Sequence, residues 1–473
     1  MNLTDYHAAI ARKRIAFAPR GFADVTAADI PAGMFDHQAH GIEFGLRTGA
    51  AGLFFDTGLG KTAMELAWAQ AVIRRTNKPV LMLAPLAVGQ QHVREAERLG
   101  IDARISRFGS PPSEPAIAIT NYERLEKFDP ADYAGVVLDE SSILKSFSGA
   151  TTKKLIHAFR EMPYRLEGSA TPAPNDHTEL GQHSEFLGVM PADQMRVRWF
   201  KHDSADTRLW KLKGHAVRPF WDWVSSWARC VTRPSDLGFS DDGFDLPPLN
   251  IHRHTVEADR SGHAGEERSG KLRGQSRLFR IPDTSATSIH HEKRLTITDR
   301  AAKVAELVNA EPDEPWIIWC DTDYEEESLR RVLPTANHVR GSMTVDVKED
   351  RLTAFSSGES RYLITKPRIA GYGLNWQHCA RMVFAGLSFS YEAYYQAVRR
   401  CWRFRQARPV DCHVVCADTE AAIWDVVSRK AGDHDMMKRE MADAMKRASQ
   451  SYAVMSKYEP QQEARFPAWM HDA

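Results

Sequence analysis

The sequence predicts an α/β protein with two lobes, each built on a parallel β-sheet. Short apolar runs, each followed by a turn and a helical pattern, recur in both halves of the chain. A different kind of sequence separates the two series, rich in Trp over 191–245 and polar and basic over 260–290. In the first half, one run ends in a glycine–lysine loop and a later run ends in an acidic pair. Together these features indicate a large two-lobed protein with ligands at strand ends.

The apolar runs give the expected strands and domain boundaries. In the first half they are 51–55, 80–85, 116–120, 135–140 and 164–172; in the second half they are 315–320, 361–366, 381–386 and 411–417. Continuous apolar strands that alternate with helices favour parallel sheets covered on both faces. With a boundary near Leu246-Pro247-Pro248, we expect an N-terminal extension (1–30), a first lobe (31–190), a helical Trp-rich connector (191–255), a second lobe (256–430) and a helical tail (431–473).

Composition is that of an ordinary globular protein. Lys and Arg total 62, as do Asp and Glu, so net charge gives no indication of nucleic acid, and any such surface must come from local patches. The sequence has no long apolar segment, and we expect a cytoplasmic protein of a bacterial or phage-infected cell, without membrane contact. The six cysteines form no C-x-x-C pair and are expected to be buried free thiols.

The glycine–lysine loop is the strongest chemical signal. It follows strand 51–55 and opens a helix, so its backbone N–H groups and the helix N-terminus can surround phosphate oxygens. Lys61 can reach the β- and γ-phosphates of ATP, and the Thr62 hydroxyl can ligate Mg²⁺. Phe55 replaces the usual first glycine of this motif, but the strand–loop–helix context supports the assignment. The expected nucleotide contacts are Thr57, Gly58, Gly60, Lys61 and Thr62.

The acidic pair Asp139-Glu140 follows the apolar strand 135–140. Asp139 is suited to hold Mg²⁺, and Glu140 to orient or deprotonate the attacking water. By itself such a pair is more often a solvated strand end. After a phosphate loop in the same expected sheet, it is the partner that ATP hydrolysis requires.

These motifs resemble those of superfamily-two helicases, and within them the Swi/Snf-like, DEAD/DEAH-type ATPases and their compact phage and prophage relatives. The first-lobe segments that carry the resemblance are Phe35-Asp36-His37-Gln38, 56–62, Ala84-Pro85-Leu86, Thr120-Asn121-Tyr122, 139–142, 168–172 and Asn175 with Glu179-Leu180. The second-lobe segments are Arg340-Gly341-Ser342 with Arg351 and Phe355, then 371–375, and the helix 396–406.

The resemblance implies two RecA-like lobes of a P-loop NTPase, with a nucleotide cleft between them and ATP and Mg²⁺ as cofactors. It implies that Gln38 reads adenine, that Gly371 and Gly373 contact the nucleotide, and that Arg400 and Arg403 act as arginine fingers. It assigns coupling to nucleic acid to Thr120, Tyr122, Ser169, Thr171, Ser342 and Gln396. Two positions depart from the pattern: Ser142 stands where many relatives have His, and Arg399 where remodellers often have Asp.

The expected function is an ATP-driven DNA translocase or helicase, with duplex DNA as the favoured track. Two alternatives stay open: a nucleotide-gated scaffold that recruits phage or bacterial DNA-processing proteins, and an RNA helicase. The Trp cluster within 199–227 and the stripe Met437, Met441 and Met445 are expected to pack internally, the stripe on the second lobe. The basic segment 260–280 is equally consistent with a linker and with a DNA contact.

Overall fold

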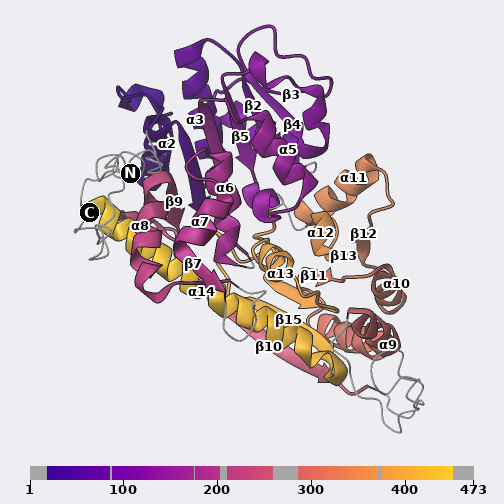
Figure 1. Ribbon diagram of the computed structural model, residues 1–473. Helices are drawn as coiled ribbons and strands as arrows, with labels where there is room; N and C mark the ends of the chain where they lie inside the picture. Colours follow the sequence, from indigo (N-terminus) through magenta and orange to yellow (C-terminus); the bar gives the residue numbers. More distant parts are fainter. Residues whose placement is uncertain are drawn as a thin grey trace, which may run out of the picture. The chain divides into compact units, whose positions relative to one another are not determined.

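The computed structural model divides into two compact units, Met1–Asp241 with Met436–Ala473, and Asp242–Asp435 (Figure 1). The structure describes residues 19–85, 88–174, 176–202, 210–258, 286–370 and 375–450. Several predictions therefore lie outside the described residues: those for Leu86, Asn175, the basic segment 260–280, Gly371 and Gly373.

The first unit is built on a seven-stranded parallel sheet in the order β3-β4-β2-β5-β6-β1-β9. The strands are β1 (Ala50–Phe55), β2 (Val80–Ala84), β3 (Ala103–Ile105), β4 (Ile117–Asn121), β5 (Gly135–Asp139), β6 (Tyr164–Gly168) and β9 (Ala228–Val231). All five predicted strands are confirmed. Strands β1 and β2, for example, are buried along their whole length, which explains why their sequences are continuous apolar runs. The short strands β3 and β9 were not predicted.

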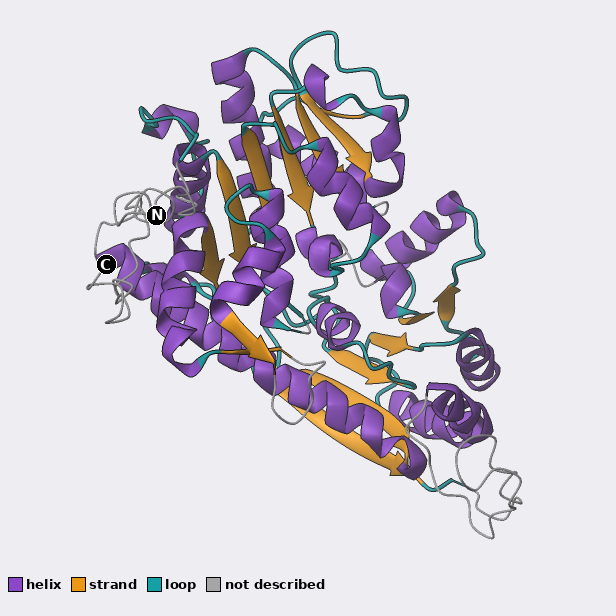
Figure 2. Cartoon of the chain, viewed as in Figure 1, coloured by secondary structure: helices purple, strands orange, loops and turns teal. Residues whose placement is uncertain are grey.

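Helices pack around this sheet (Figure 2). They are α2 (Asp36–Thr48), α3 (Lys61–Thr76), α4 (Gly89–Arg98), α5 (Ala150–Ala158), α6 (Leu180–Phe186), α7 (Ala192–Trp199) and α8 (Val217–Trp227). Short 3₁₀ helices are η1 (Ala27–Asp29), η3 (Tyr122–Lys127), η4 (Pro130–Asp132), η5 (Ser141–Lys145), η6 (His177–Glu179), η7 (Gly214–Ala216) and η8 (Pro234–Leu237). Helix α3 is buried on most of its surface, which holds the phosphate loop at its N-terminus firmly against the sheet.

The Trp-rich segment belongs to the first unit and forms part of its core. Trp199, Trp221, Trp223 and Trp227 are each at most 5% exposed, and the rings of Trp223 and Trp227 lie 5.4 Å apart. The prediction of internal packing is therefore confirmed for these four rings. Beside them, β7 (Phe200–His202) and β8 (Trp210–Leu212) form an antiparallel pair that was not predicted.

The second unit is built on a six-stranded parallel sheet in the order β10-β15-β14-β11-β13-β12. Its strands are β10 (Leu249–Val256), β11 (Trp316–Trp319), β12 (Asn337–Val339), β13 (Tyr362–Thr365), β14 (Arg381–Phe384) and β15 (Val410–Ala417). Its other elements are α9 (Ala286–Ala310), α10 (Asp323–Val332), α11 (Val345–Ser356), α12 (Pro367–Ala370), α13 (Tyr391–Val398) and η9 (Asp418–Glu420). The four predicted strands are confirmed, and with them the prediction of two α/β lobes on parallel sheets.

Helix α14 (Ala421–Gln450) starts in the second unit and ends in the first. Met437, Met441 and Met445 are buried, which confirms the helix and its internal stripe. The prediction that this stripe docks on the second lobe is wrong, because the chain from Met436 onward belongs to the first unit. A helix of 30 residues is about 45 Å long and so extends past the sheet on which it begins.

Two further expectations concern the chain as a whole. All six cysteines are buried and free, as predicted. Within the described ranges, no helix has the length and apolar character needed to cross a membrane.

Candidate active site

The phosphate loop connects β1 to α3 and depends on glycine. Gly58 and Gly60 have φ values of 95° and 82°, in the left-handed region that residues with a Cβ rarely adopt. A Cβ on Gly60 would also lie 2.1 Å from the Gln38 amide nitrogen. The predicted strand–loop–helix arrangement is present, with α3 starting at Lys61.

Lys61 occupies the interior of this loop. Its ammonium donates hydrogen bonds to the backbone oxygens of Phe55, at 2.7 Å, and Asp56, at 3.3 Å. Burial lowers the pKa of Lys61, and the carboxylates of Glu140 and Asp56 partly offset that effect. The ammonium is thus held by two neutral carbonyls, which a phosphate group could replace as a stronger acceptor.

The segment predicted to read adenine lies directly against the loop. Gln38 Nε2 donates to the Leu59 backbone oxygen at 3.2 Å, and its Oε1 accepts from the Phe35 backbone N–H at 3.1 Å. His37 Nε2 lies 3.2 Å from the same Leu59 oxygen. The start of α2 is therefore tied to the phosphate loop, while adenine reading by Gln38 stays a prediction.

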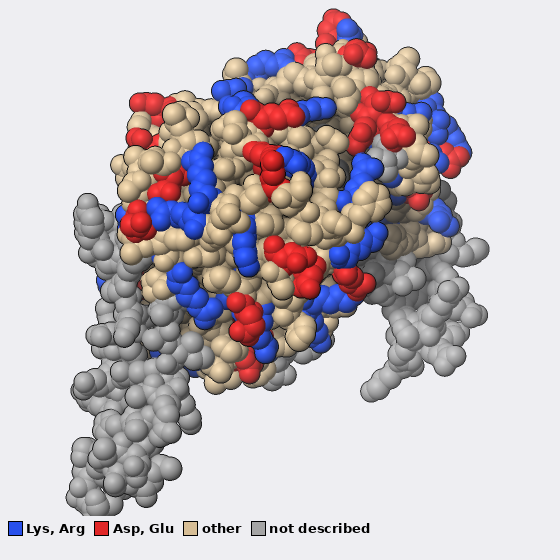
Figure 3. Space-filling view, turned by 90° about the horizontal axis from the view of Figure 1, so that it is seen from above, with Lys and Arg blue, Asp and Glu red and all other residues tan. Residues whose placement is uncertain are grey.

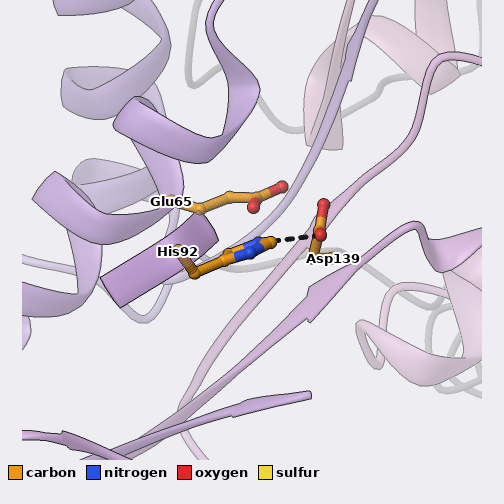
Figure 4. Close-up of side chains that lie close together, drawn as sticks. All are labelled: Glu65, His92 and Asp139. Atoms are coloured by element: carbon orange, nitrogen blue, oxygen red, sulfur yellow. Dashed lines mark ion pairs between the residues drawn. The ribbon is translucent and has the colours of Figure 1, made fainter. Parts of the chain in front are cut away.

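The acidic pair lies at the carboxyl end of β5, and its two carboxylates have different partners. Asp139 Oδ2 lies 2.8 Å from His92 Nε2 of α4 (Figure 4). Burial opposes a charge on His92, but the Asp139 carboxylate outweighs it and raises the pKa of His92. Glu140 has a φ of 58°, uncommon for a residue with a side chain, and such strain is concentrated at functional sites.

Ser169 joins Glu140 to the segment that follows β6. Its hydroxyl donates to Glu140 Oε1 at 2.8 Å and accepts from the Thr171 backbone N–H at 3.0 Å. Ser169 and Thr171 are fully buried. The structure thus brings together the predicted base and two of the predicted coupling residues.

Thr120 and Tyr122 approach the same site from inside the protein. They are 6% and 9% exposed, and the Tyr122 hydroxyl donates to the Asp139 backbone oxygen at 2.6 Å. Burial, before any nearby charge, raises the pKa of Tyr122 well above its usual range. Tyr122 therefore holds the backbone of Asp139 in place, and too little of its side chain is exposed to contact a nucleic acid.

The remaining predicted residues lie in the second unit. Gln396 is buried in α13, and its side-chain and backbone oxygens accept from Arg400 at 3.3 and 3.2 Å. Burial, followed by repulsion from Arg400 and Arg399, lowers the pKa of Arg403 to about 9. Ser342 is exposed in the turn after β12.

The prediction that 396–406 is one helix is wrong beyond Val398. Helix α13 ends there, and Arg400 and Arg403 lie in the turns that follow. The Arg400 backbone oxygen accepts a hydrogen bond from the Trp376 backbone N–H at 3.0 Å. The chain after Val398 therefore runs toward Trp376 and does not continue the helix.

The first unit offers oxygen ligands suited to magnesium. Thr62 lies in the first turn of α3, and Asp139 ends β5. One helical turn after Thr62, Glu65 is fully buried, and burial raises its pKa well above the usual range. Such oxygens fit Mg²⁺, which would neutralise charge on ATP phosphates when bound. Ligation by Thr62 and Asp139 remains a prediction.

Sequence reasoning missed Glu65 and His92. Each is a single polar residue within a helix, without a motif around it. Glu65 had one available signal, because a carboxylate one turn after Thr62 projects from the same helix face. Nothing in the sequence pairs His92 with Asp139.

Comparison with known proteins identifies part of the chain and its fold. Residues 299–405 match the family described as helicase conserved C-terminal domain. Dbp5 from S. cerevisiae, bound to RNA and ADP BeF3, matches with a TM-score of 0.54 at 12% identity, over 87% of this chain and 93% of that one. A variant of S. cerevisiae Dbp5 in a complex of the same description matches with a TM-score of 0.53 at 13% identity, over 86% and 93%. A comparison with curated proteins gives no match.

The matched segment 299–405 runs from α9 past α13 and contains four strands of the second sheet, β11 to β14. The first sheet carries the phosphate loop and the acidic pair. The chain accordingly has a two-lobed α/β fold like that of these solved structures, and residues 299–405 of its second unit are similar to the helicase conserved C-terminal domain.

Proposed function

We propose that this protein is an ATP-driven translocase or helicase that moves on DNA, with duplex DNA the favoured track. The observation that carries the proposal is the hydrogen bond from Ser169 to Glu140. It attaches the residue suited to activate water to the segment after β6, which is the segment expected to respond to nucleic acid. Through this contact, a movement of that segment can change the position of the residue that activates water.

The site's residues divide the chemistry of hydrolysis among them. When ATP binds, the Lys61 ammonium exchanges its two backbone oxygens for phosphate oxygens. Glu140 accepts the proton of the attacking water, and Asp139 with Thr62 would hold the metal. Arg400 and Arg403 of the second unit neutralise charge that develops on the γ-phosphate when the two lobes close on the nucleotide.

Contact with the track is expected to involve mostly phosphates, so that sequence preference is low. On the face seen in Figure 3, Lys and Arg side chains are interspersed with Asp and Glu, and no broad area of one sign stands out. A local surface, and not the net charge, would therefore bind the nucleic acid.

An RNA helicase is the second candidate, because the similar solved structures are of a protein bound to RNA. The deciding experiment measures ATP hydrolysis alone and with duplex DNA, single-stranded DNA or RNA. We expect many-fold stimulation, largest with duplex DNA. Larger stimulation by RNA would select the RNA helicase. Equal rates in all four conditions would contradict a motor and leave the nucleotide-gated scaffold.

Two variants make this experiment specific. Lys61→Ala removes the phosphate contact and should abolish turnover, which excludes a contaminating ATPase. Glu140→Gln keeps the side chain's size and its partner Ser169, and it should bind ATP and nucleic acid with little turnover. Loss of ATP binding in Glu140→Gln would show that this residue does not act on the water.

A further inference from the structure

Three side chains from three elements of the first unit converge on one point. Glu65 comes from α3, His92 from α4 and Asp139 from the end of β5, and one ligand atom of each lies within 4.8 Å of the other two (Figure 4). Glu65 and His92 are 0% and 3% exposed. The proposed hydrolysis uses only Asp139 of the three.

The two ring nitrogens of His92 both lie close to oxygen atoms that accept hydrogen bonds. Its Nδ1 lies 2.7 Å from the Val88 backbone oxygen, and a carbonyl only accepts, so this nitrogen carries the proton of a neutral ring. In that tautomer the Nε2 lone pair faces the Asp139 carboxylate at 2.8 Å. Two acceptors so close require a positive species: either a second proton on the ring or a metal ion bound to both.

Glu65 distinguishes these two options. It is directed into the same site, and neither of its oxygens has a hydrogen-bond partner among the described residues. A Cβ on Gly168 would lie 1.9 Å from Glu65 Oε1, so the glycine at the end of β6 makes the space for this carboxylate. A proton on His92 gives Asp139 a partner but leaves the buried Glu65 carboxyl without one, whether it is ionised or neutral, whereas a cation is a partner for all three groups.

We propose that Glu65, His92 and Asp139 bind a divalent transition-metal ion, Mn²⁺ in preference to Mg²⁺, before any nucleotide arrives. The imidazole nitrogen favours a first-row transition metal over Mg²⁺. With metal–ligand bonds of about 2.1 Å, adjacent ligands lie about 3.0 Å apart on an octahedral ion and about 3.4 Å apart on a tetrahedral one. The 2.8 Å between His92 Nε2 and Asp139 Oδ2 is close enough for both atoms to bind one ion.

The site deepens the proposed function, and it rests on that proposal only through Asp139, the residue shared with the metal of ATP hydrolysis. In many phosphoryl-transfer sites one or two carboxylates and the substrate phosphates hold the metal. Here the protein supplies three ligands of its own. The metal would then be resident, and ATP would bind to a lobe that already contains it.

The test is a titration of the full chain with Mn²⁺ alone, without nucleotide, followed by electron paramagnetic resonance. The expected result is one bound ion per chain, with magnetic coupling to a single imidazole nitrogen. Glu65→Gln and His92→Gln should each weaken binding by more than about tenfold, and His92→Gln should remove the nitrogen coupling. A large excess of Mg²⁺ should be needed to displace the bound Mn²⁺.

Glu95→Gln is the matched control. Glu95 lies on the same helix as His92, but its carboxylate pairs with Arg98 at 2.5 Å, outside the three-residue site. This variant should bind Mn²⁺ as the unchanged protein does. Circular dichroism melting curves of all variants show whether each is folded.

Three results would overturn the inference: no binding without ATP, binding that survives both ligand substitutions, or a bound ion without nitrogen coupling. Hydrolysis of Mg²⁺-ATP measured on the same preparations separates the two proposals. Nucleic-acid-stimulated turnover without a Mn²⁺ site overturns this inference alone. A Mn²⁺ site without stimulated turnover overturns the proposed function alone.

Discussion

At the scale of single residues, the hydroxyl of Ser169 is the connection on which the coupling argument depends. The buried Ser169 hydroxyl donates to the half-buried Glu140 carboxylate and accepts from the Thr171 backbone N–H. A hydrogen bond to a charged group contributes about 1.5–3 kcal/mol, enough to fix the rotamer of Glu140. The orientation of the Glu140 side chain and the backbone conformation at Thr171 therefore depend on each other.

Ser169→Ala should separate ATP binding from stimulated hydrolysis. Without the hydroxyl, Glu140 is no longer held toward the segment after β6, and stimulated turnover should fall by roughly tenfold or more, while ATP affinity stays within about twofold. Steady-state rates with and without nucleic acid, together with nucleotide titrations, measure both quantities. Ser184→Ala is the control, since that buried hydroxyl donates only to the backbone oxygens of Gly181 and Met190. Equal stimulation in the two variants would contradict the coupling role.

Residues differ in how far the sequence could predict them. Lys61, Thr62, Asp139 and Glu140 sit in local motifs whose spacing follows from one loop or one strand end, and the structure places all four at one end of the first sheet. The contacts of His92 and Glu65 join elements distant in the chain, so that only the folded structure pairs them. A local pattern carries no information about such pairs.

At the scale of elements, burial on both faces decided which strands could be predicted. The five central strands of the first sheet and four of the second read as apolar runs, since helices cover both faces. Strand β10 is an edge strand with mostly exposed residues, and β12 and β3 have three residues each, too few for any period. The Met stripe of α14 was predictable from its spacing, but not the start of the helix at Ala421 or the unit on which its second half packs.

Helix α6 is anchored to β6 by a buried pair whose charge depends on pH. His183 Nδ1 lies 3.1 Å from Glu167 Oε2, and Nε2 lies 2.8 Å from the Pro172 backbone oxygen, with both side chains fully buried. Burial opposes the charge of the ring, but the Glu167 carboxylate outweighs it and raises the pKa of His183 above its usual value of about 6.5. Both ring nitrogens face acceptors, which favours the imidazolium form.

The sign of the resulting pH dependence follows from that direction. A raised pKa in the folded state gives stability that is complete below the unfolded-state pKa of about 6.5, and that is lost as pH rises through the folded-state value. The melting temperature should therefore fall as pH rises above about 6.5. His183→Gln should melt lower at pH 6 and show a smaller decline. The same decline in both proteins would mean that other groups cause it.

Helix α14 also touches the phosphate loop of the first unit. Lys438 Nζ lies 3.1 Å from Asp56 Oδ2. The other carboxylate oxygen, Asp56 Oδ1, accepts a hydrogen bond from the Thr57 backbone N–H at 2.6 Å. Asp56 is the first residue after β1 and is 9% exposed. The second half of α14 thus supports the loop where it leaves the sheet.

Lys438→Ala should weaken ATP binding by roughly tenfold or more, because the loop then loses a charged hydrogen bond of about 1.5–3 kcal/mol. Arg429→Ala is the control: Arg429 lies on the same helix but pairs at 3.5 Å with exposed Asp433. A nucleotide titration followed by fluorescence measures both. If the two variants bind ATP equally well, the Lys438–Asp56 contact stabilises the fold but does not affect nucleotide affinity.

At the scale of the whole molecule, the proposed site divides its chemistry between the two units. The phosphate loop and the acidic pair belong to the first, and Arg399, Arg400 and Arg403 to the second. Burial, followed by repulsion from Arg400 and Arg399, lowers the pKa of Arg403 to about 9. A phosphate anion would relieve that repulsion, which makes this cluster suited to bind a nucleotide when the lobes close.

Arg403→Ala tests the two-lobe mechanism most directly. Arg403 can act on the γ-phosphate only when the second unit closes on the first, and an arginine finger is worth roughly 10³–10⁵ in rate because it offsets charge that appears mainly in the transition state. ATP and nucleic-acid affinities should stay within a few-fold, while stimulated hydrolysis should fall by orders of magnitude. Arg403→Lys should rescue poorly, since an ammonium lacks the planar fork that spans two oxygens.

Arg408→Ala is the control, because Arg408 pairs with Glu314 at 2.9 Å on the surface. Near-normal turnover in both Arg400→Ala and Arg403→Ala would mean that the second unit does not complete the active site, and the motor mechanism would have to be abandoned.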